Sequence, residues 1–446
     1  MATVHVIGAG VAGLSCAVRL ADAGRQVRLY EAAAQGGGRC RSFFDATIER
    51  TIDNGNHMIL AANAATLAYL DAIGARDSLV GPPEAVFPFF DLGTGARWTL
   101  RPNGGRIPWW VASPGRRVPG TRIGQYLAVL RLARAGPTAT VADCLDTEQP
   151  LFKRFFEPLA VAALNAAPRE GSARLLWAVV AETFLRGGRA ARAFVVREGL
   201  SASFVDPALA RLRRAGTEVR FGERLRAVEA AGGRVRALNF GDARVELGAD
   251  DAVVLAVPPA AAGALLPGLT APEESRAILN LHFRLKRPAV LPDGAPYLGL
   301  IGGLAQWVFV RGDVAAVTVS AADGVIERPA PELAAAAWRD VARALLGVDP
   351  GVDAAALPPY RVIKERRATF AQTPAAAARR PGARTALANL FLAGDWTDTG
   401  LPATIEGAIR SGRRAADLVE AAGRSGLVLR QAQDEALMVS LSNHDR

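Results

Sequence analysis

A glycine-rich turn between an apolar strand and a helix, at the start of the chain, constrains the fold more than any other feature. Apolar residues 4–7 lead into Gly8, Gly10 and Gly13, and an acid, Glu31, follows eighteen residues after Gly13. Gly8 permits a tight turn, Gly10 lets the backbone approach a pyrophosphate, and Gly13 lets the helix pack closely on the strand. This arrangement predicts a nucleotide site, and the alternative is a glycine-rich turn that holds no ligand.

The residues after the turn complete the unit. Val11 and Ala12 open the predicted helix, whose N-terminal amides and positive dipole end suit phosphate groups. Residues 26–30 predict a second strand, and Glu31 follows it, where a carboxylate can bind ribose hydroxyls. Strand, helix, second strand and acid in this order predict a dinucleotide-binding βαβ unit.

At 446 residues the chain is too long for one simple core, so we expect two domains. We predict an α/β fold: a discontinuous Rossmann-like cofactor domain, with a parallel sheet plus a β-meander, and an inserted α+β substrate domain. Further strands are predicted near 218–221, 235–240, 252–257 and 391–395. Stretches that mix helices and short strands separate them from one another and from the first unit. The predicted segments are the cofactor domain at 1–75, 196–270 and 386–422, the substrate domain at 76–195 and 271–385, and a polar, frayed tail at 423–446.

Composition limits the classes of partner. The net charge is +10, which indicates either the arginine and alanine bias of a GC-rich genome or attraction to an anionic membrane. No nucleic-acid recognition module is evident. The three cysteines and four histidines are widely spaced, so we expect a reducing cytoplasm and no metal site. Residues 1–14 form no signal peptide, and the uncharged run 252–272 contains prolines that favour a buried strand and loop over a membrane span.

Aromatic residues interleaved with proline predict loops and short strands between 80 and 120. Since aromatics and arginines suit a bilayer interface, we list them as candidates for peripheral membrane contact, with core packing as the alternative. The candidates are Phe87, Phe89, Phe90, Trp109, Trp110, Arg116 and Arg117.

A second glycine run follows Glu31. Gly37 and Gly38 let the backbone pass close to a ligand. The positively charged, planar guanidinium of Arg39 can donate two hydrogen bonds to a phosphate. Acid, short spacer, Gly-Gly-Arg and Ser42 resemble the flavin-binding motif of the amine oxidase and phytoene desaturase superfamily. That resemblance implies FAD as the cofactor and Glu31 as the ligand of its adenosine ribose.

Three later segments are similar to the same superfamily. The Asp53–His57 segment resembles one that passes the isoalloxazine ring, Gly394-Asp395 resembles a motif whose acid binds the ribityl chain, and residues 400–408 resemble the start of the last helix, whose amides face the flavin. In the family a central strand packs apolar side chains on adenine. The cofactor residues that the resemblance implies here are Gly55, Asn56, His57, Leu225, Gly394, Asp395, Ala403, Thr404 and Ile405.

Within the superfamily, residues 53–60, 158–165 and 394–412 look like the squalene-associated FAD-dependent desaturases, the family of hydroxysqualene dehydroxylase. The resemblance implies reductive removal of an allylic hydroxyl from a long apolar isoprenoid, in squalene and hopanoid synthesis. Such a substrate lives in a bilayer, so we expect a cytoplasmic protein, peripheral on the inner face of the cell membrane. The alternatives are a carotenoid or phytoene-type desaturase or isomerase, a flavin amine oxidase or protoporphyrinogen oxidase, and a flavin-binding protein without turnover.

The catalytic candidates are His57 and Thr404. His57 lies in the segment expected near the flavin and could handle a proton, although a structural histidine is the alternative. Thr404 falls where amine oxidases place an aromatic residue in front of the flavin, and its hydroxyl could bond the substrate hydroxyl. We expect Asp53 and Glu406 to be structural, as caps of turns or helices. No second glycine motif for a nicotinamide is evident, so we expect an external electron donor.

Overall fold

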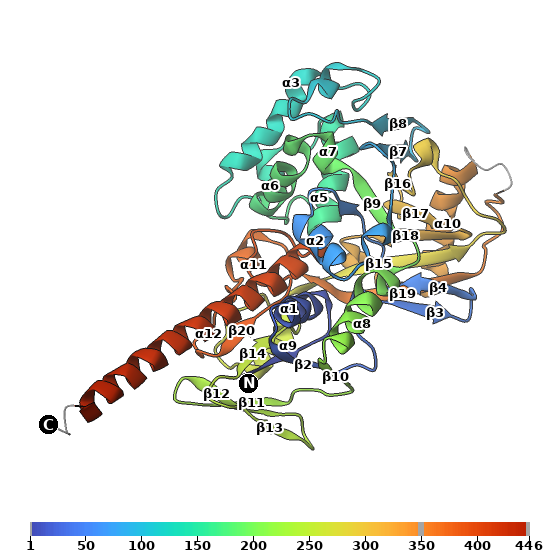
Figure 1. The fold of residues 1–446 in the computed structure, drawn as a ribbon. Helices are drawn as coiled ribbons and strands as arrows, with labels where there is room; N and C mark the ends of the chain where they lie inside the picture. Colours follow the sequence, from blue (N-terminus) through green and yellow to red (C-terminus); the bar gives the residue numbers. More distant parts are fainter. Residues whose placement is uncertain (1, 347–351, 443–446) are drawn as a thin grey trace.

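A five-stranded parallel sheet forms the half of the molecule that holds the N-terminus (Figure 1). In this computed structural model, residues 2–346 and 352–442 are described, with 425–442 described by backbone only. All four strand pairings are parallel, and the order is β10-β2-β1-β14-β20. The strands are β1 (Thr3–Ile7), β2 (Gln26–Glu31), β10 (Glu218–Phe221), β14 (Ala252–Leu255) and β20 (Leu390–Leu392). The predicted α/β class and parallel sheet are confirmed.

Helices cover one face of this sheet and a β-meander covers the other. α1 (Val11–Asp22) packs against α12 (Ile405–Ser442), with α8 (Asp206–Arg214) beside it. The two helices are close because Gly412 lacks a side chain: a Cβ there would lie 2.0 Å from the carbonyl oxygen of Ala12. The meander is β11 (Ala227–Ala231), β12 (Arg234–Asn239) and β13 (Arg244–Glu246), and α9 (Pro259–Leu265) joins it in a second apolar cluster against the sheet.

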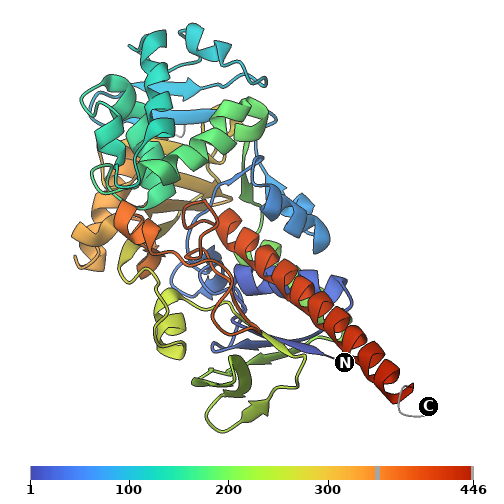
Figure 2. The ribbon, with the colours of Figure 1, turned by 90° about the vertical axis from the view of Figure 1, so that its left-hand side faces the viewer.

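The C-terminal segment differs from its prediction. Instead of a frayed tail from 423, the backbone of α12 stays helical to Ser442 and leads out of the body of the molecule (Figure 2). The sequence of this stretch is rich in Leu, Ala, Gln and Arg, which favour a helix. The polar residues after 423 therefore do not mark the end of the helix. Residues 443–446 of the predicted tail lie outside the described residues.

A seven-stranded mixed sheet forms the centre of the other half. Its order is β19-β15-β18-β17-β16-β7-β8, antiparallel except between β16 and β7. On one face, α10 (Ala330–Leu346) packs Trp338 against Phe283. The strands are β7 (Phe87–Asp91), β8 (Arg97–Leu100), β15 (Ser275–Arg284), β16 (Tyr297–Ile301), β17 (Trp307–Arg311), β18 (Val314–Val319) and β19 (Tyr360–Phe370).

A layer of short helices covers the other face of this sheet, at the top of Figures 1 and 2. Its members are α2 (Ala64–Ala72) at its border, η2 (Trp109–Ala112), α3 (Ile123–Tyr126), η3 (Leu127–Arg134), α4 (Val141–Cys144), η4 (Phe152–Phe156), α5 (Glu157–Leu164), α6 (Ala173–Glu182) and α7 (Gly188–Ala191). Smaller sheets join the layers: β3 (Ser42–Asp45) with β4 (Arg50–Asp53), and β5 (Ile59–Leu60) and β6 (Leu79–Val80) on either side of β9 (Ala193–Val196). An apolar core that we call the helical-layer cluster fills the space between this layer and the sheet.

Four of the five aromatic candidates for membrane contact are buried. Phe87 and Phe89 on β7 point into the helical-layer cluster, and their neighbour Phe90 points to the α10 side. Trp110 is also buried, whereas Trp109 is 55 % exposed. The prediction was wrong for the three residues of β7 because both faces of their sheet are covered, and for Trp110 because its ring packs against Tyr126.

The strands of the parallel sheet come from the predicted segments 1–75, 196–270 and 386–422, and those of the seven-stranded sheet from 76–195 and 271–385. The division into a cofactor domain and a substrate domain stays a prediction. Within residues 2–346 and 352–442, no helix combines the length and the apolar content needed to cross a bilayer.

Candidate active site

The glycine turn after β1 has the geometry of a phosphate cradle. Gly8 has a φ of +106°, and a Cβ on it would lie 2.4 Å from the carbonyl oxygen of Ala256. A Cβ on Gly13 would lie 1.9 Å from the carbonyl oxygen of Gly8, so the start of α1 sits directly on the turn. By contrast, a Cβ on Gly10 would meet nothing within 4 Å. The first intrahelical hydrogen bond runs from Leu14 N–H to Gly10, so the amides before Leu14 are the ones that a helix leaves for a phosphate.

Glu31 lies beside this turn. Its carboxylate accepts hydrogen bonds from the amides of Ala9 and Ala33, each at 2.8 Å. The Glu31 carbonyl accepts from the amide of Glu223, which brings the segment after β10 to the same place. Leu225 belongs to this segment, but it precedes β11 rather than lying on a strand as predicted, and its side chain packs against the meander side of the sheet. The acid and the apolar candidate therefore share one end of the cradle.

The second glycine run lies against the first. Gly37 forms a bridge with Gly10 and donates its amide to Ala9 at 2.7 Å. Both Gly37 and Gly38 have positive φ values, +100° and +57°, which a side chain would strain. The two glycine motifs thus form one surface of bare backbone next to the N-terminus of α1. This surface is what a pyrophosphate requires, so the residues fit the cofactor.

Arg39 and Asp395 form a clasp between distant parts of the chain. The guanidinium of Arg39 donates to both carboxylate oxygens of Asp395, at 2.7 and 2.8 Å, and a second nitrogen donates to the carbonyl of Ala368. The charge of Asp395 raises the pKa of Arg39. Asp395 is buried, and the preceding Gly394 donates its amide to the Ser411 hydroxyl at 2.7 Å. The sequence predicted separate roles for Arg39 on phosphate and Asp395 on the ribityl chain, whereas the structure joins the two side chains.

The segment of His57 is fixed to the seven-stranded sheet. Asn56 donates to the hydroxyl of Thr318 at 3.1 Å, and Asn280 donates to the carbonyl of Asn54 at 3.2 Å. The Nε2 of His57 lies near this network, since a Cβ on Gly55 would be 3.6 Å from it. Burial lowers the pKa of His57 to about 4. The imidazole is therefore neutral at pH 7, and it can offer an N–H to a leaving oxygen without carrying a charge.

Asp53 and Glu406 are structural, as predicted. Asp53 pairs with Arg311 at 2.6 Å and accepts from the amide of Leu200 at 2.8 Å. Glu406 accepts from the amides of Ala65 and Thr66, so it caps the first turn of α2. Both carboxylates are buried and hold segments that are distant in the sequence.

The loop before α12 is held by residues that the sequence did not indicate. The amide of Ala403, expected to face the flavin, donates instead to the side chain of Gln372 at 2.8 Å. Gln372 is fully buried and donates to the carbonyl of Leu164 at 2.7 Å. The next residues, Thr404 and Ile405, begin the helix beside this link. The sequence does not predict these roles of Gln372, Asn280 and Ser411, because each makes its hydrogen bond to a residue that is not a neighbour in the sequence.

Thr404 is the N-cap of α12. Its hydroxyl accepts from the amide of Gly407 at 3.0 Å and donates to the carbonyl of Pro402 at 3.3 Å. Thr404→Ala is therefore expected to lower the free energy of unfolding by about 1 kcal/mol, and Thr404→Ser to leave it unchanged. Denaturant unfolding, with kcat measured on both variants, checks this. A kcat lost in Thr404→Ala at unchanged stability would restore the predicted catalytic role.

Acid should destabilise the protein through a buried histidine on β15. Burial lowers the pKa of His282 to about 4, so the folded state keeps it neutral while the unfolded state takes up a proton below pH 6.5. Stability is therefore lost as the pH falls from 6.5 towards 4. Between pH 6.5 and 5, His282 is expected to cost ~2 kcal/mol. Urea unfolding at pH 7 and pH 5 measures this, and His282→Gln should lose less stability between these pH values than the unmodified protein does. Equal losses would contradict the assignment.

Comparison with known proteins places the chain among flavoenzymes. The family model described as flavin containing amine oxidoreductase matches residues 11–420. Hydroxysqualene dehydroxylase of Rhodopseudomonas palustris is 51 % identical over 424 residues, covering 95 % of this chain and 99 % of the relative. The Sinorhizobium fredii protein of the same name is 49 % identical, covering 93 % and 97 %. A wild-type putrescine oxidase structure, solved with putrescine, has a TM-score of 0.68 at 18 % identity, covering 94 % and 99 %, and so shares the fold.

Proposed function

Because this chain belongs to the flavin-containing amine oxidoreductases and, within them, to the hydroxysqualene dehydroxylase family, we propose that it reduces hydroxysqualene to squalene with FAD as its cofactor. The observation that carries the proposal is the likeness to hydroxysqualene dehydroxylases over nearly the full length of both chains. The fold alone does not decide the substrate, since amine oxidases share it.

The residues that would hold the ADP part of FAD lie around the glycine turn after β1. Gly8, Gly10 and Gly13 leave room for the pyrophosphate, and Glu31 lies where a carboxylate can bind the adenosine ribose. When bound and reduced, FAD supplies a hydride, so that a C–H bond replaces the allylic C–O bond and the hydroxyl leaves with a proton as water. The cofactor residues of the 37–39, 55–57, 394–395 and 403–405 segments remain part of this proposal.

His57 is the best candidate to assist the departing hydroxyl. As a neutral imidazole it donates an N–H at pH 7, and its position is set by the bonds of the neighbouring Asn56 to β18. Met58, the next residue, packs against the helical-layer cluster. This packing supports a proton-handling role for His57 near an apolar region that suits a hydrocarbon.

The helical-layer cluster is a large apolar core on the side of the molecule where Met58 lies. Its aromatic members follow one another with ring centroids 5.1 to 5.7 Å apart, from Phe156 through Phe155 and Phe184 to Phe87. Met58 packs on the same cluster next to His57. Since squalene precursors partition into bilayers, we include in the proposal peripheral contact with the inner face of the cell membrane and an electron donor outside this chain.

One experiment tests the proposed reaction. The holoenzyme is reduced without oxygen and mixed with hydroxysqualene, and flavin absorbance and products are followed. We expect flavin reoxidation with squalene formed in equal amount. Reduction of the oxidised flavin by phytoene, with no response to hydroxysqualene, would favour a carotenoid-type desaturase instead. His57→Gln should lower the reoxidation rate by ~10²-fold or more if His57 assists the hydroxyl. The rates are compared per bound flavin, because His57 is also a proposed cofactor residue.

A further inference from the structure

Five exposed apolar side chains gather on the helical layer, and we propose that they dock this protein on an anionic lipid bilayer. We call them the apolar stripe: Ile107, Trp109, Ile123, Leu127 and Leu130. The inference rests on the proposed function in one respect, that the substrate lives in a membrane. Of the residues that the sequence predicted for this contact, the proposal keeps Trp109 and Arg116, and it leaves out the buried Phe87, Phe89, Phe90 and Trp110.

Two buried aromatic rings bring the parts of the stripe together. Trp110 of η2 and Tyr126 of α3 pack edge to face, with ring centroids 5.4 Å apart. Because these rings point inward, Trp109 and Leu127, their neighbours in sequence, are left on the outer side of two adjoining elements. Asn103 fixes the turn before η2, accepting from the amide of Trp110 and donating to the carbonyl of Ile107. The exposed residues thus stand on a rigid support.

The spacing of the other three residues forms a single row. Ile123 and Leu127 are four residues apart at the end of an α-helical turn, and Leu130 follows three residues later in a 3₁₀ turn. Positions i and i+4 share a face of an α-helix, and positions i and i+3 share a face of a 3₁₀-helix. The change of helix type therefore keeps the row straight, while Leu132 and Tyr126 point into the core.

The charges around the stripe identify the occupant. Residues 102–139 contain six arginines and no aspartate, glutamate or lysine. The guanidinium of Arg116 lies over the ring of Trp109, 4.9 Å from its centroid, an arrangement suited to the level of lipid head groups. A segment that carries these apolar side chains and has only cations as charged residues complements a surface that is apolar beneath and anionic above, which favours a bilayer over an acidic soluble protein.

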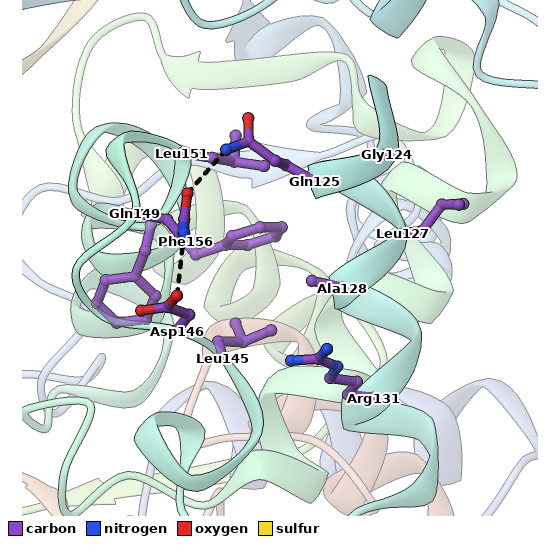
Figure 3. A pocket seen from close by; sticks show the side chains of 11 residues that line it. Gly124, Gln125, Leu127, Ala128, Arg131, Leu145, Asp146, Gln149, Leu151 and Phe156 are labelled. Atoms are coloured by element: carbon purple, nitrogen blue, oxygen red, sulfur yellow. Dashed lines mark hydrogen bonds between the residues drawn. The ribbon is translucent and has the colours of Figure 1, made fainter. Parts of the chain in front are cut away.

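A hollow opens beside the stripe. A cavity of about 460 Å³ lies between η3 and η4, and Leu127 and Arg131 line its outer side (Figure 3). Hydrogen bonds between the side chains of Gln125, Gln149 and Asp146 border it. Its lining also includes Phe156, a buried member of the helical-layer cluster. A membrane at the stripe would therefore lie next to this cavity.

Vesicle sedimentation tests the docking surface. Full-length holoenzyme is mixed with vesicles of phosphatidylcholine alone, or of phosphatidylcholine and phosphatidylglycerol in equal parts. We expect binding only to the second, weakened ~tenfold or more in Leu127→Ser/Leu130→Ser. Arg131→Gln/Arg134→Gln should weaken binding by ~fivefold per arginine at low salt. Ile107→Ser/Trp109→Ser gives an independent pair should the first fold poorly.

Matched control variants replace exposed apolar or arginine side chains that lie outside the stripe. Phe44 and Val290 are exposed apolar residues outside the stripe, and Arg213 and Arg214 lie on α8. Phe44→Ser/Val290→Ser and Arg213→Gln/Arg214→Gln should therefore bind vesicles like the unmodified protein. Stripe variants that bind vesicles normally would overturn the proposal, as would equal binding to both vesicle types. Self-association that the stripe variants abolish, without vesicle binding, would assign the surface to a second copy. Turnover of hydroxysqualene in detergent micelles separates the two proposals, because Ile107→Ser/Trp109→Ser, which lies outside the cavity, should retain it.

Discussion

Gly13→Ala is expected to give little soluble protein, whereas Gly10→Ala should fold normally and purify without FAD. The added methyl of Gly13→Ala would meet the carbonyl oxygen of Gly8 at 1.9 Å, a contact between backbone-level atoms that no side-chain rotation relieves. α1 must then move off β1, at a cost of ~3 kcal/mol or more. The methyl of Gly10→Ala meets nothing within 4 Å, and the φ of −70° at Gly10 suits alanine.

The open space at Gly10 is the place that a pyrophosphate needs, so Gly10→Ala should weaken FAD binding by ~tenfold to a hundredfold. The measurements are soluble yield, the urea unfolding midpoint of the apoprotein, and the flavin content of purified protein. Gly24→Ala serves as a glycine control far from the cradle, since a Cβ there is also unobstructed, although its positive φ will cost some stability. Normal FAD content in Gly10→Ala would contradict the location of the pyrophosphate.

Asp395→Ala is expected to lose both FAD and stability. It removes the carboxylate that accepts two hydrogen bonds from Arg39 and leaves that guanidinium without its partner. A fully buried pair would cost ~3–5 kcal/mol when broken. Because the Arg39 side chain is 42 % exposed, water replaces part of the lost interaction, and we expect about 2 kcal/mol.

The clasp joins residues 39 and 395, so its loss should also loosen the cofactor site, with FAD affinity lowered ~100-fold. Denaturant unfolding and flavin titration of the apoprotein measure the two effects. Asp398→Ala is the matched control, because Asp398 is exposed and lies three residues away. In a double-mutant cycle, Arg39→Ala and Asp395→Ala should be strongly non-additive. Additive effects would show that the two side chains act separately.

Local patterns in the sequence were sufficient to predict the βαβ unit. The start of α1 and the position of β2 follow from apolar spacing and glycine positions within about thirty residues. The family resemblance located the distant segments, but their contacts could not be predicted. Gln372 reaches Ala403 and Leu164, and Asn280 reaches Asn54, through bonds across the fold that no local pattern encodes.

The main error of the sequence-based prediction was to expect exposed aromatic residues on β7. A strand with large side chains at successive positions is equally consistent with an exposed face or with a sheet covered on both sides, and only the placement of α10 and the helical layer decides for β7. The true exposed stripe was less conspicuous in sequence, since Ile123, Leu127 and Leu130 also fit the buried face of an amphipathic helix. Tyr126 and Leu132 occupy that face instead.

The clasp between Arg39 and Asp395 has a consequence for how the protein is made. A ribosome adds ~5–20 residues per second, so the glycine cradle emerges roughly 20–80 s before Asp395 and β20. During that interval β14 lacks its outer neighbour and α1 lacks α12. Flavin capture is therefore a late event of synthesis, and a chain that terminates before residue 395 leaves an apoprotein with an open sheet edge, a target for chaperones and proteases rather than a smaller working enzyme.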